Sequence, residues 1–144
     1  MIIVDTNVLL YAYDITSERH HEAVAWLESV MNGQESIGLP FLNLLAFIRI
    51  STNPRVFGNP LGTDDALSIV QSWLARPQVV IPAPTSRHWD QLAEVCRDAQ
   101  ATGPLVMDAH LATLAQEHGA RICTTDRDFR RFDGLTTIEP SAPV

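Results

Sequence analysis

Aspartates that could bind a metal ion occur at two places where a β-rich run ends. Asp5 follows an apolar run at the start of the chain and precedes Thr6 and Asn7, a pattern typical of a strand that turns into a helix. Asp126 and Asp128 follow a second β-rich run in the same way. In a parallel sheet, side chains just beyond the carboxyl ends of the strands face the crevice where ligands bind. These acids are therefore candidate ligands.

A further aspartate, Asp108, lies within a helical pattern. Leu105, Leu111 and Ala112 stand three or four residues from it, so Asp108 shares the apolar stripe of that helix. An ionised carboxylate on such a stripe costs several kcal/mol unless it is paired or bound to a metal ion. Asp108 is thus a candidate metal ligand, with an ion pair to an arginine as the structural alternative.

The acids after the strands also have structural alternatives. Asp5 could cap a helix over residues 7–13. Thr125 and Asp128 fit a capping box, in which the threonine is the N-cap and the aspartate, at the third helical position, accepts a hydrogen bond from the N-cap backbone N–H. That box leaves Asp126 free for a role in the site.

If the strands before Asp5 and Asp126 are neighbours, these acids and Asp108 share one pocket. Two carboxylates about 4 Å apart repel by roughly 4 kcal/mol at an effective dielectric constant near 20, so such a cluster takes up protons or binds a hard cation. Oxygen ligands favour Mg²⁺ or Mn²⁺ over zinc. The sequence offers no competing Cys-x₂-Cys, His-x₃-His or Ser–His–Asp arrangement, and we expect surface or packing roles for the histidines: His20, His21, His88, His110 and His118.

Composition narrows the classes of function further. The net charge is −7, and all ten basic residues are arginines. The absence of lysine excludes Walker P-loops, Schiff-base enzymes, phosphatases of the haloacid dehalogenase type and phospho-receiver domains. Two cysteines are too few for a disulfide framework, and we expect both to be buried thiols. No apolar run reaches the roughly 18 residues that a membrane helix needs, so we expect a soluble cytoplasmic protein.

The elements that must position the acids alternate between short β-rich runs and longer helical patterns. The sequence predicts strands over 2–4, 36–39, 79–81, 121–124 and 136–138, and helices over 18–31, 41–51, 64–75, 87–99 and 105–118. Strands separated by helices imply parallel crossovers. We therefore expect one α/β domain over 1–144, a three-layer α/β/α sandwich with a mainly parallel sheet and a loose tail at 139–144.

Residues at the ends of these helices fit the expected boundaries. Ser17 and Thr63 are placed to cap the helices that follow them, and Pro104 suits a first turn. Gly33 and Gly119 follow helices where a left-handed C-cap residue is favoured.

Three segments resemble the acidic motifs of PIN domains. They are Val4-Asp5-Thr6-Asn7-Val8-Leu9-Leu10-Tyr11-Ala12, Met107-Asp108-Ala109-His110-Leu111-Ala112 and Thr124-Thr125-Asp126-Arg127-Asp128-Phe129. Their order and separations also fit, and the resemblance covers nearly the whole chain. It is strongest to VapC toxins of bacterial type II toxin–antitoxin modules.

This resemblance implies a PIN-like fold with a five-stranded parallel sheet and a Mg²⁺- or Mn²⁺-dependent endoribonuclease. It implies metal ligation and catalysis by Asp5, Asp108 and Asp126, with Asp128 as a further ligand. Thr6, Asn7 and Thr124 would orient the ligands or water. It also implies a cognate antitoxin, an RNA substrate and a homodimer. Local positive charge for RNA phosphates would come from the candidate arginines Arg49, Arg55, Arg127, Arg130 and Arg131.

One position in the helix predicted over 41–51 departs from the family pattern. PIN domains usually carry a glutamate where Ala46 stands here, and no Asp or Glu occurs between Glu35 and Asp64. Either the remaining aspartates suffice for cleavage, or the protein is a PIN-like module that binds RNA or protein with weak or no cleavage. If an antitoxin binds, we expect its basic side chains to pair with the acids. Its apolar anchors would enter a groove between the helix of Trp26 and the helix of Leu44.

Overall fold

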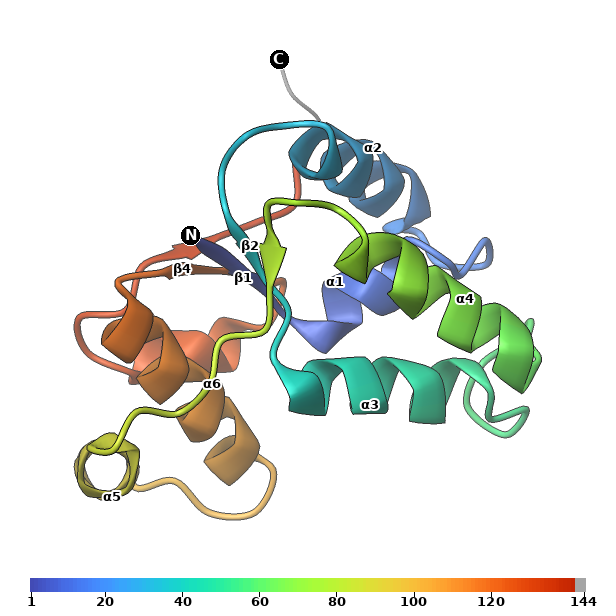
Figure 1. Ribbon diagram of the computed structural model, residues 1–144. Coiled ribbons are helices and arrows are strands. Elements are labelled where there is room, and N and C mark those ends of the chain that lie inside the picture. The colour runs from blue at the N-terminus through green and yellow to red at the C-terminus, as the bar shows by residue number, and fades with distance from the viewer. Residues whose placement is uncertain (142–144) are drawn as a thin grey trace.

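Five parallel strands form the middle layer of the computed structural model, which describes residues 1–141 (Figure 1). They are β1 (Ile2–Val4), β2 (Ile37–Gly38), β3 (Val79–Val80), β4 (Arg121–Cys123) and β5 (Thr137–Ile138). The strand order is β3-β2-β1-β4-β5, so β1 lies at the centre and the chain changes direction across the sheet between β1 and β4. The condition for a shared pocket is met, because β1 and β4 are neighbours in a parallel register that pairs Val4 with Cys123.

Helices cover both faces of the sheet. They are α1 (Thr6–Tyr11), α2 (His20–Met31), α3 (Phe41–Ser51), α4 (Thr63–Leu74), α5 (His88–Ala99), α6 (Leu105–His118) and the 3₁₀ helix η1 (Arg127–Arg131). Figure 1 shows α1 to α4 on one side and α5 and α6 on the other. The expected three-layer α/β/α sandwich is confirmed.

Alternation along β1 builds the two cores. Ile2 and Val4 pack with α1 to α4, whereas Ile3 packs with α5, α6 and η1. Successive side chains of a strand point to opposite faces, so a fully buried central strand is apolar on both. The central position of β1 therefore explains why the chain begins with an unbroken apolar run.

Two helix ends differ from the sequence prediction. Gly119 does adopt the left-handed conformation after α6, with φ of 60°. Gly33 does not, because α2 closes on Asn32 in a right-handed conformation. The amide of Gln78 instead caps this end of α2, since its Nε2 donates to the carbonyl oxygen of Met31 at 2.7 Å.

The N-terminal helix ends also shift slightly. Arg19, not Ser17, is the N-cap of α2, which begins at His20, and Gly62, not Thr63, is the N-cap of α4. Ser17 still supports the turn before α2, because its hydroxyl accepts a hydrogen bond from the Arg19 amide at 3.1 Å. These shifts move no residue of the candidate site.

A chain of polar side chains joins α5 to α6 and was not expected from the sequence. The Glu117 carboxylate accepts hydrogen bonds from Thr85 and His88, and His88 Nε2 lies 2.9 Å from His110 Nδ1. Burial lowers the pKa of His110, and the neighbouring His88 adds to this effect. His88 and His110 therefore hold two helices together through polar contacts between residues far apart in the sequence.

Other expectations bear on the ends of the chain and the thiols. No helix within residues 1–141 is both long enough and apolar enough to cross a membrane. Cys123 is buried and Cys96 is half-buried, and both are free thiols. Of the tail expected at 139–144, Pro140 is buried and 142–144 lie outside the described residues.

Candidate metal centre

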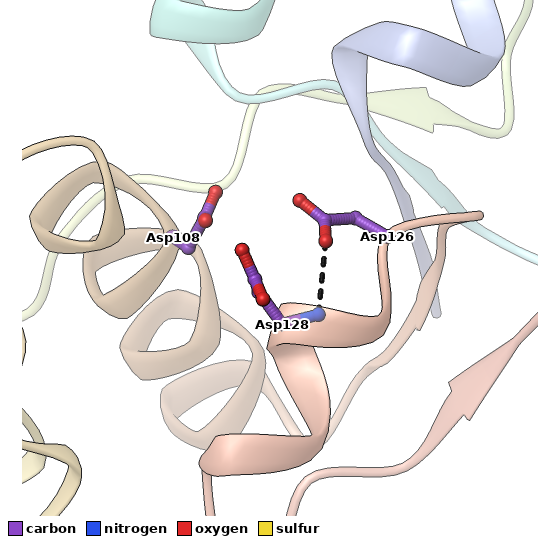
Figure 2. A group of neighbouring side chains, drawn as sticks. All are labelled: Asp108, Asp126 and Asp128. Carbon is purple, nitrogen blue, oxygen red and sulfur yellow. Dashed lines mark hydrogen bonds between the residues drawn. The ribbon is translucent and has the colours of Figure 1, made fainter.

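Four aspartates meet at the carboxyl ends of β1 and β4. Asp5 follows β1, Asp126 and Asp128 follow β4, and Asp108 lies in the first turn of α6. A carboxylate oxygen from each of Asp108, Asp126 and Asp128 lies within 4.8 Å of the others. Figure 2 shows these three side chains pointing into one space between α6 and η1. The acids identified in the sequence therefore form one cluster, in which Asp5 takes a separate position beside the other three.

Asp5 is held by contacts with the strand next to it. It occupies the N-cap position of α1 but makes no capping hydrogen bond through its side chain. Its Oδ2 instead accepts from the Thr124 hydroxyl at 2.8 Å, and its backbone N–H donates to the Cys123 carbonyl at 3.0 Å. Capping therefore does not account for the Asp5 side chain.

Thr124 also connects Asp5 to the second acidic segment. Its hydroxyl oxygen accepts from the Asp126 backbone N–H at 2.9 Å. Asp126 in turn accepts from the Asp128 N–H at 2.9 Å, drawn as the dashed line in Figure 2. The expected capping box at Thr125 is wrong, because η1 begins at Arg127 and Asp126 is its N-cap. The local fold thus fixes Asp126 by capping and leaves Asp128 exposed at the mouth of the cluster.

Burial and neighbouring charges make two of the acids harder to ionise. Burial raises the pKa of Asp108 to about 6, and the charges of Asp5, Asp126 and Asp128 contribute to the rise. Burial also raises the pKa of Asp5, although the Thr124 hydroxyl and the nearby N–H groups of Thr6 and Asn7 partly oppose it. A carboxylate cluster of this kind holds protons more tightly than isolated acids do.

Within residues 1–141, no basic side chain forms an ion pair with the cluster. The ion pairs within residues 1–141 join His88 to Glu117 and Arg121 to Glu35, so the alternative of an arginine partner for Asp108 is wrong. Partly buried carboxylates without a cationic partner are a donor set that suits a hard divalent cation. The residues present therefore fit Mg²⁺ or Mn²⁺.

The remaining predicted residues fall into two groups. Thr6 and Asn7 are the first residues of α1, and neither side chain makes a hydrogen bond within the described part of the chain. Arg131 donates to the Ala99 carbonyl at 2.9 Å and so has a structural contact at the end of α5. The other candidate arginines have exposed side chains: Arg49, Arg55, Arg127 and Arg130.

Ala46 lies on the wall of an apolar groove beside the cluster. The groove is lined by α3 residues and by Met107, the residue that precedes Asp108. Arg49 lines the same groove and is its one charged wall residue. The position expected to carry a glutamate thus borders a surface shared by α3 and the start of α6.

The fold and the acidic motifs are those of one protein family. The family model for the PIN domain matches residues 2–135, and the chain therefore belongs to the PIN domain family. Among curated proteins, it is 44% identical to Ribonuclease VapC37 of Mycobacterium tuberculosis, over 99% of each chain. It is 39% identical to Ribonuclease VapC43 of the same species, over 97% of this chain and 95% of the other.

Solved structures share the fold at low identity. The toxin VapC20 of Mycobacterium tuberculosis, described as cleaving the sarcin-ricin loop, superposes with a TM-score of 0.69 at 18% identity, over 97% of this chain and 100% of that one. A chain of the VapBC2 complex of Rickettsia felis, bound to a DNA fragment of its promoter, gives 0.67 at 16% identity, over 96% and 98%. The five-stranded parallel PIN-like fold is confirmed.

Proposed function

We propose that this protein is a metal-dependent endoribonuclease and the toxin of a type II toxin–antitoxin pair. The observation that carries the proposal is the unneutralised cluster of Asp5, Asp108, Asp126 and Asp128 in a PIN fold. Full-length relatives that are named VapC ribonucleases support the same reading. The proposal thus rests on site chemistry as well as on kinship.

In this proposal Asp108, Asp126 and Asp128 hold Mg²⁺ or Mn²⁺, and Asp5 contributes directly or through water. A bound divalent ion supplies an activated water and stabilises the charge that develops on the phosphoryl oxygens. One of the four aspartates takes the proton that the attacking water loses. Thr124 keeps Asp5 and Asp126 in place, as its two hydrogen bonds indicate.

Substrate phosphates require positive charge, which a chain with net charge −7 can supply only locally. We propose Arg127, which precedes Asp128 in η1, as a contact for an RNA backbone at the cluster. Arg49 lines the apolar groove of α3 and is a weaker candidate, because a second copy is proposed to cover that groove. Arg55 and Arg130 are exposed and are weaker candidates, because no described contact connects them to the acids.

Cleavage of RNA by the purified protein tests this function. Total RNA is incubated with the protein with and without Mn²⁺, and the cut ends are mapped. We expect metal-dependent cuts at defined sites, with no cuts in the Asp108→Asn variant. Binding of RNA without cleavage would favour the alternative, a PIN-like binding module in which Ala46 replaces the usual glutamate.

Metal binding should depend on pH through Asp108. Its pKa of about 6 in the folded protein means that a proton must leave before a cation binds. We expect Mn²⁺ affinity, measured by titration calorimetry, to fall about tenfold from pH 7.5 to pH 5.0. The free energy of unfolding of the metal-free protein should depend on pH in the opposite direction to Mn²⁺ affinity. Folded Asp108 keeps its proton up to about pH 6, whereas the unfolded carboxyl loses it near its ordinary value of 3.8, so stability falls as pH rises through that window. A Mn²⁺ affinity that does not change with pH would contradict the assigned ligand.

A pocket between α2 and α4 is the proposed docking site for an antitoxin. It is lined by the half-buried Tyr13, the core residue Trp73, and the exposed Glu28 and Arg76, and so combines an aromatic floor with charges of both signs. Trp26 and Leu44, the residues expected to form a groove between α2 and α3, are both buried in the core. The pocket between α2 and α4 also has exposed walls in Glu28 and Arg76, and it is therefore proposed in place of that groove. Expression of the protein alone should arrest growth. Co-expression with the neighbouring gene product should restore growth and yield a complex that co-purifies.

An apolar face on α3 and the start of α6 is the proposed homodimer interface. Leu42, Leu45 and Met107 line the groove described above and are 42%, 48% and 54% exposed. Phe41 and Val106, their neighbours in sequence, are exposed as well. Contiguous exposed apolar side chains are typical of protein interfaces. A second copy is the proposed occupant, because the face borders the cluster and carries Arg49 as its one charged groove residue.

Leu45→Arg is expected to convert a dimer into a monomer, because an unpaired charge would be buried at the centre of the interface. Light scattering coupled to gel filtration measures the mass. Leu67→Arg is the matched control, since Leu67 is 49% exposed but lies on α4 outside this face. A wild-type protein that is monomeric at all concentrations would contradict the proposed interface.

A further inference from the structure

β1 pairs over a shorter length with β2 than with β4, and this leaves the buried Val4 carbonyl without a partner in β2. On the β4 side the pairing continues to Val4, opposite Cys123. On the β2 side it stops one residue earlier, with Ile3 opposite Gly38. The Ile2 N–H donates to the Ser36 carbonyl, which sets the hydrogen-bond pattern between β1 and β2. If this parallel pattern continued, the Val4 carbonyl would accept from the backbone N–H of residue 40. That residue is Pro40, which has no N–H.

The side chain of Asn43 satisfies this carbonyl. Asn43 Nδ2 donates to the Val4 oxygen at 2.8 Å, across 39 positions of sequence. Asn43 lies in the first turn of α3, in an otherwise apolar segment, and its side chain is buried. A buried carbonyl left without a donor would cost roughly 1–3 kcal/mol, so this contact explains a polar residue at a core position.

The contact bears on the site because Val4 directly precedes Asp5. The peptide group between these residues is held at both polar atoms, on opposite sides of β1. Its oxygen accepts from Asn43 on the α3 side, and its N–H donates to the Cys123 carbonyl at 3.0 Å on the β4 side. These two hydrogen bonds oppose rotation of the peptide plane, and so they help to set the direction in which the Asp5 side chain leaves the backbone.

We propose that Asn43 is a positioning residue for the metal site. It holds the Val4–Asp5 peptide in the orientation that brings the Asp5 carboxylate to the Thr124 hydroxyl and the other acids. The predicted loss of metal affinity in Asn43 variants rests on the proposed metal-binding function. The predicted loosening of the Val4–Asp5 peptide does not, because it can be measured without any metal.

The chemistry of the contact requires an amide. The Val4 oxygen needs a donor, and an ionised carboxylate in the same place offers only acceptors. A carboxylate there would also add a negative charge close to Asp5, whose pKa is already raised by burial. A positioning role through Nδ2 therefore predicts that Asn43→Asp, which keeps the shape of the side chain, is as harmful as Asn43→Ala.

The experiment measures two properties of the metal-free protein and its Asn43 variants. One is Mn²⁺ affinity by titration calorimetry, which should fall about tenfold in both Asn43→Ala and Asn43→Asp, as is usual when a partner that orients a ligand is lost. The other is hydrogen exchange of the Asp5 amide by NMR. We expect it to accelerate at least about tenfold relative to the Thr124 amide, which donates to Ile138 in the same sheet.

Gln78→Ala is the matched control. Gln78 is also a side-chain amide that donates to a main-chain carbonyl of a distant segment, Met31 at 2.7 Å. It precedes β3 and so lies at the amino end of the sheet, opposite the cluster. Its loss should lower thermal stability without changing Mn²⁺ affinity or the Asp5-to-Thr124 exchange ratio.

The possible outcomes separate the two proposals. If Asn43→Asp binds Mn²⁺ as tightly as the wild type or more tightly, Asn43 acts as a ligand or plays no part, and the positioning role is overturned. An unchanged exchange ratio in both variants also overturns it. If the wild type binds no Mn²⁺, the metal-binding function fails, and the exchange ratio alone decides on Asn43.

Discussion

Replacing Asp108 with asparagine is expected to reduce RNA cleavage at least about a hundredfold, since the loss of even an outer partner of a ligand costs roughly 10- to 100-fold. The same change should raise the melting temperature of the metal-free protein. Asp108 has a pKa of about 6 because burial and three neighbouring aspartates oppose its charge. A neutral amide of the same shape relieves that repulsion, and each kcal/mol relieved is worth roughly 2–4 °C in a chain of this size.

Opposite changes in activity and stability distinguish a site residue from a structural one. Asp133→Asn is the matched control, because Asp133 is an exposed aspartate outside the cluster. Its activity and melting temperature should both match the wild type. Thermal melts with and without Mn²⁺ complete the measurement, since Mn²⁺ should stabilise the wild type but not Asp108→Asn. Full cleavage by Asp108→Asn would remove this residue from the site.

Phe47→Ala is expected to lower the free energy of unfolding by about 3–5 kcal/mol, the usual range for deletion of a fully buried aromatic ring. Phe47 has no exposed surface. Its ring centroid lies 4.8 Å from that of Trp73 on α4 and 5.7 Å from that of Tyr13, both in edge-to-face geometry. The ring thus joins α3, α4 and the segment after α1 in one core.

Phe41→Ala provides the control on the same helix. Phe41 is 59% exposed, so its truncation should change the free energy of unfolding by no more than about 0.5 kcal/mol in the monomer. Urea unfolding followed by circular dichroism measures both variants. Equal costs at the two positions would mean that the aromatic core contributes no more than the exposed end of α3.

The sequence predicts the part of the site that depends on local pattern. Asp108 stands out because one acid interrupts an apolar helical stripe, and Asp5 and Asp126 stand out because they come soon after β-rich runs. Parallel crossovers then bring the strand ends to one edge of the sheet, and the adjacency of β1 and β4 places the acids together. Pattern and topology therefore suffice for the cluster itself.

The contacts that hold the cluster depend on details that pattern does not contain. Thr125 and Asp126 are both good caps, and only the start of η1 at Arg127 decides between them. Asn43 lies in an apolar run, and its partner is a carbonyl that becomes orphaned because β2 stops at Gly38. One signal was available: a single amide in an apolar helix start, three residues after a proline.

The polar chain of His88, His110 and Glu117 was missed for a related reason. Sequence spacing within one helix gave His88 no acidic partner at the third or fourth position. Its partners lie 22 and 29 residues away, on α6. Packing of α5 against α6 creates the pair, and the pattern of either helix alone does not indicate it.

The position of β1 at the centre of the sheet has a consequence for how the protein is made. β1 is synthesised long before its partner β4 and the aspartates at the start of η1, because five helices and two strands lie between α1 and β4 in the sequence. On the ribosome, the emerging polypeptide can pair β1 with β2 long before Asp126 and Asp128 leave the exit tunnel. A cluster that joins segments 119 positions apart in sequence therefore cannot assemble before β4 and the start of η1 have been made, so no shorter nascent chain carries all four aspartates.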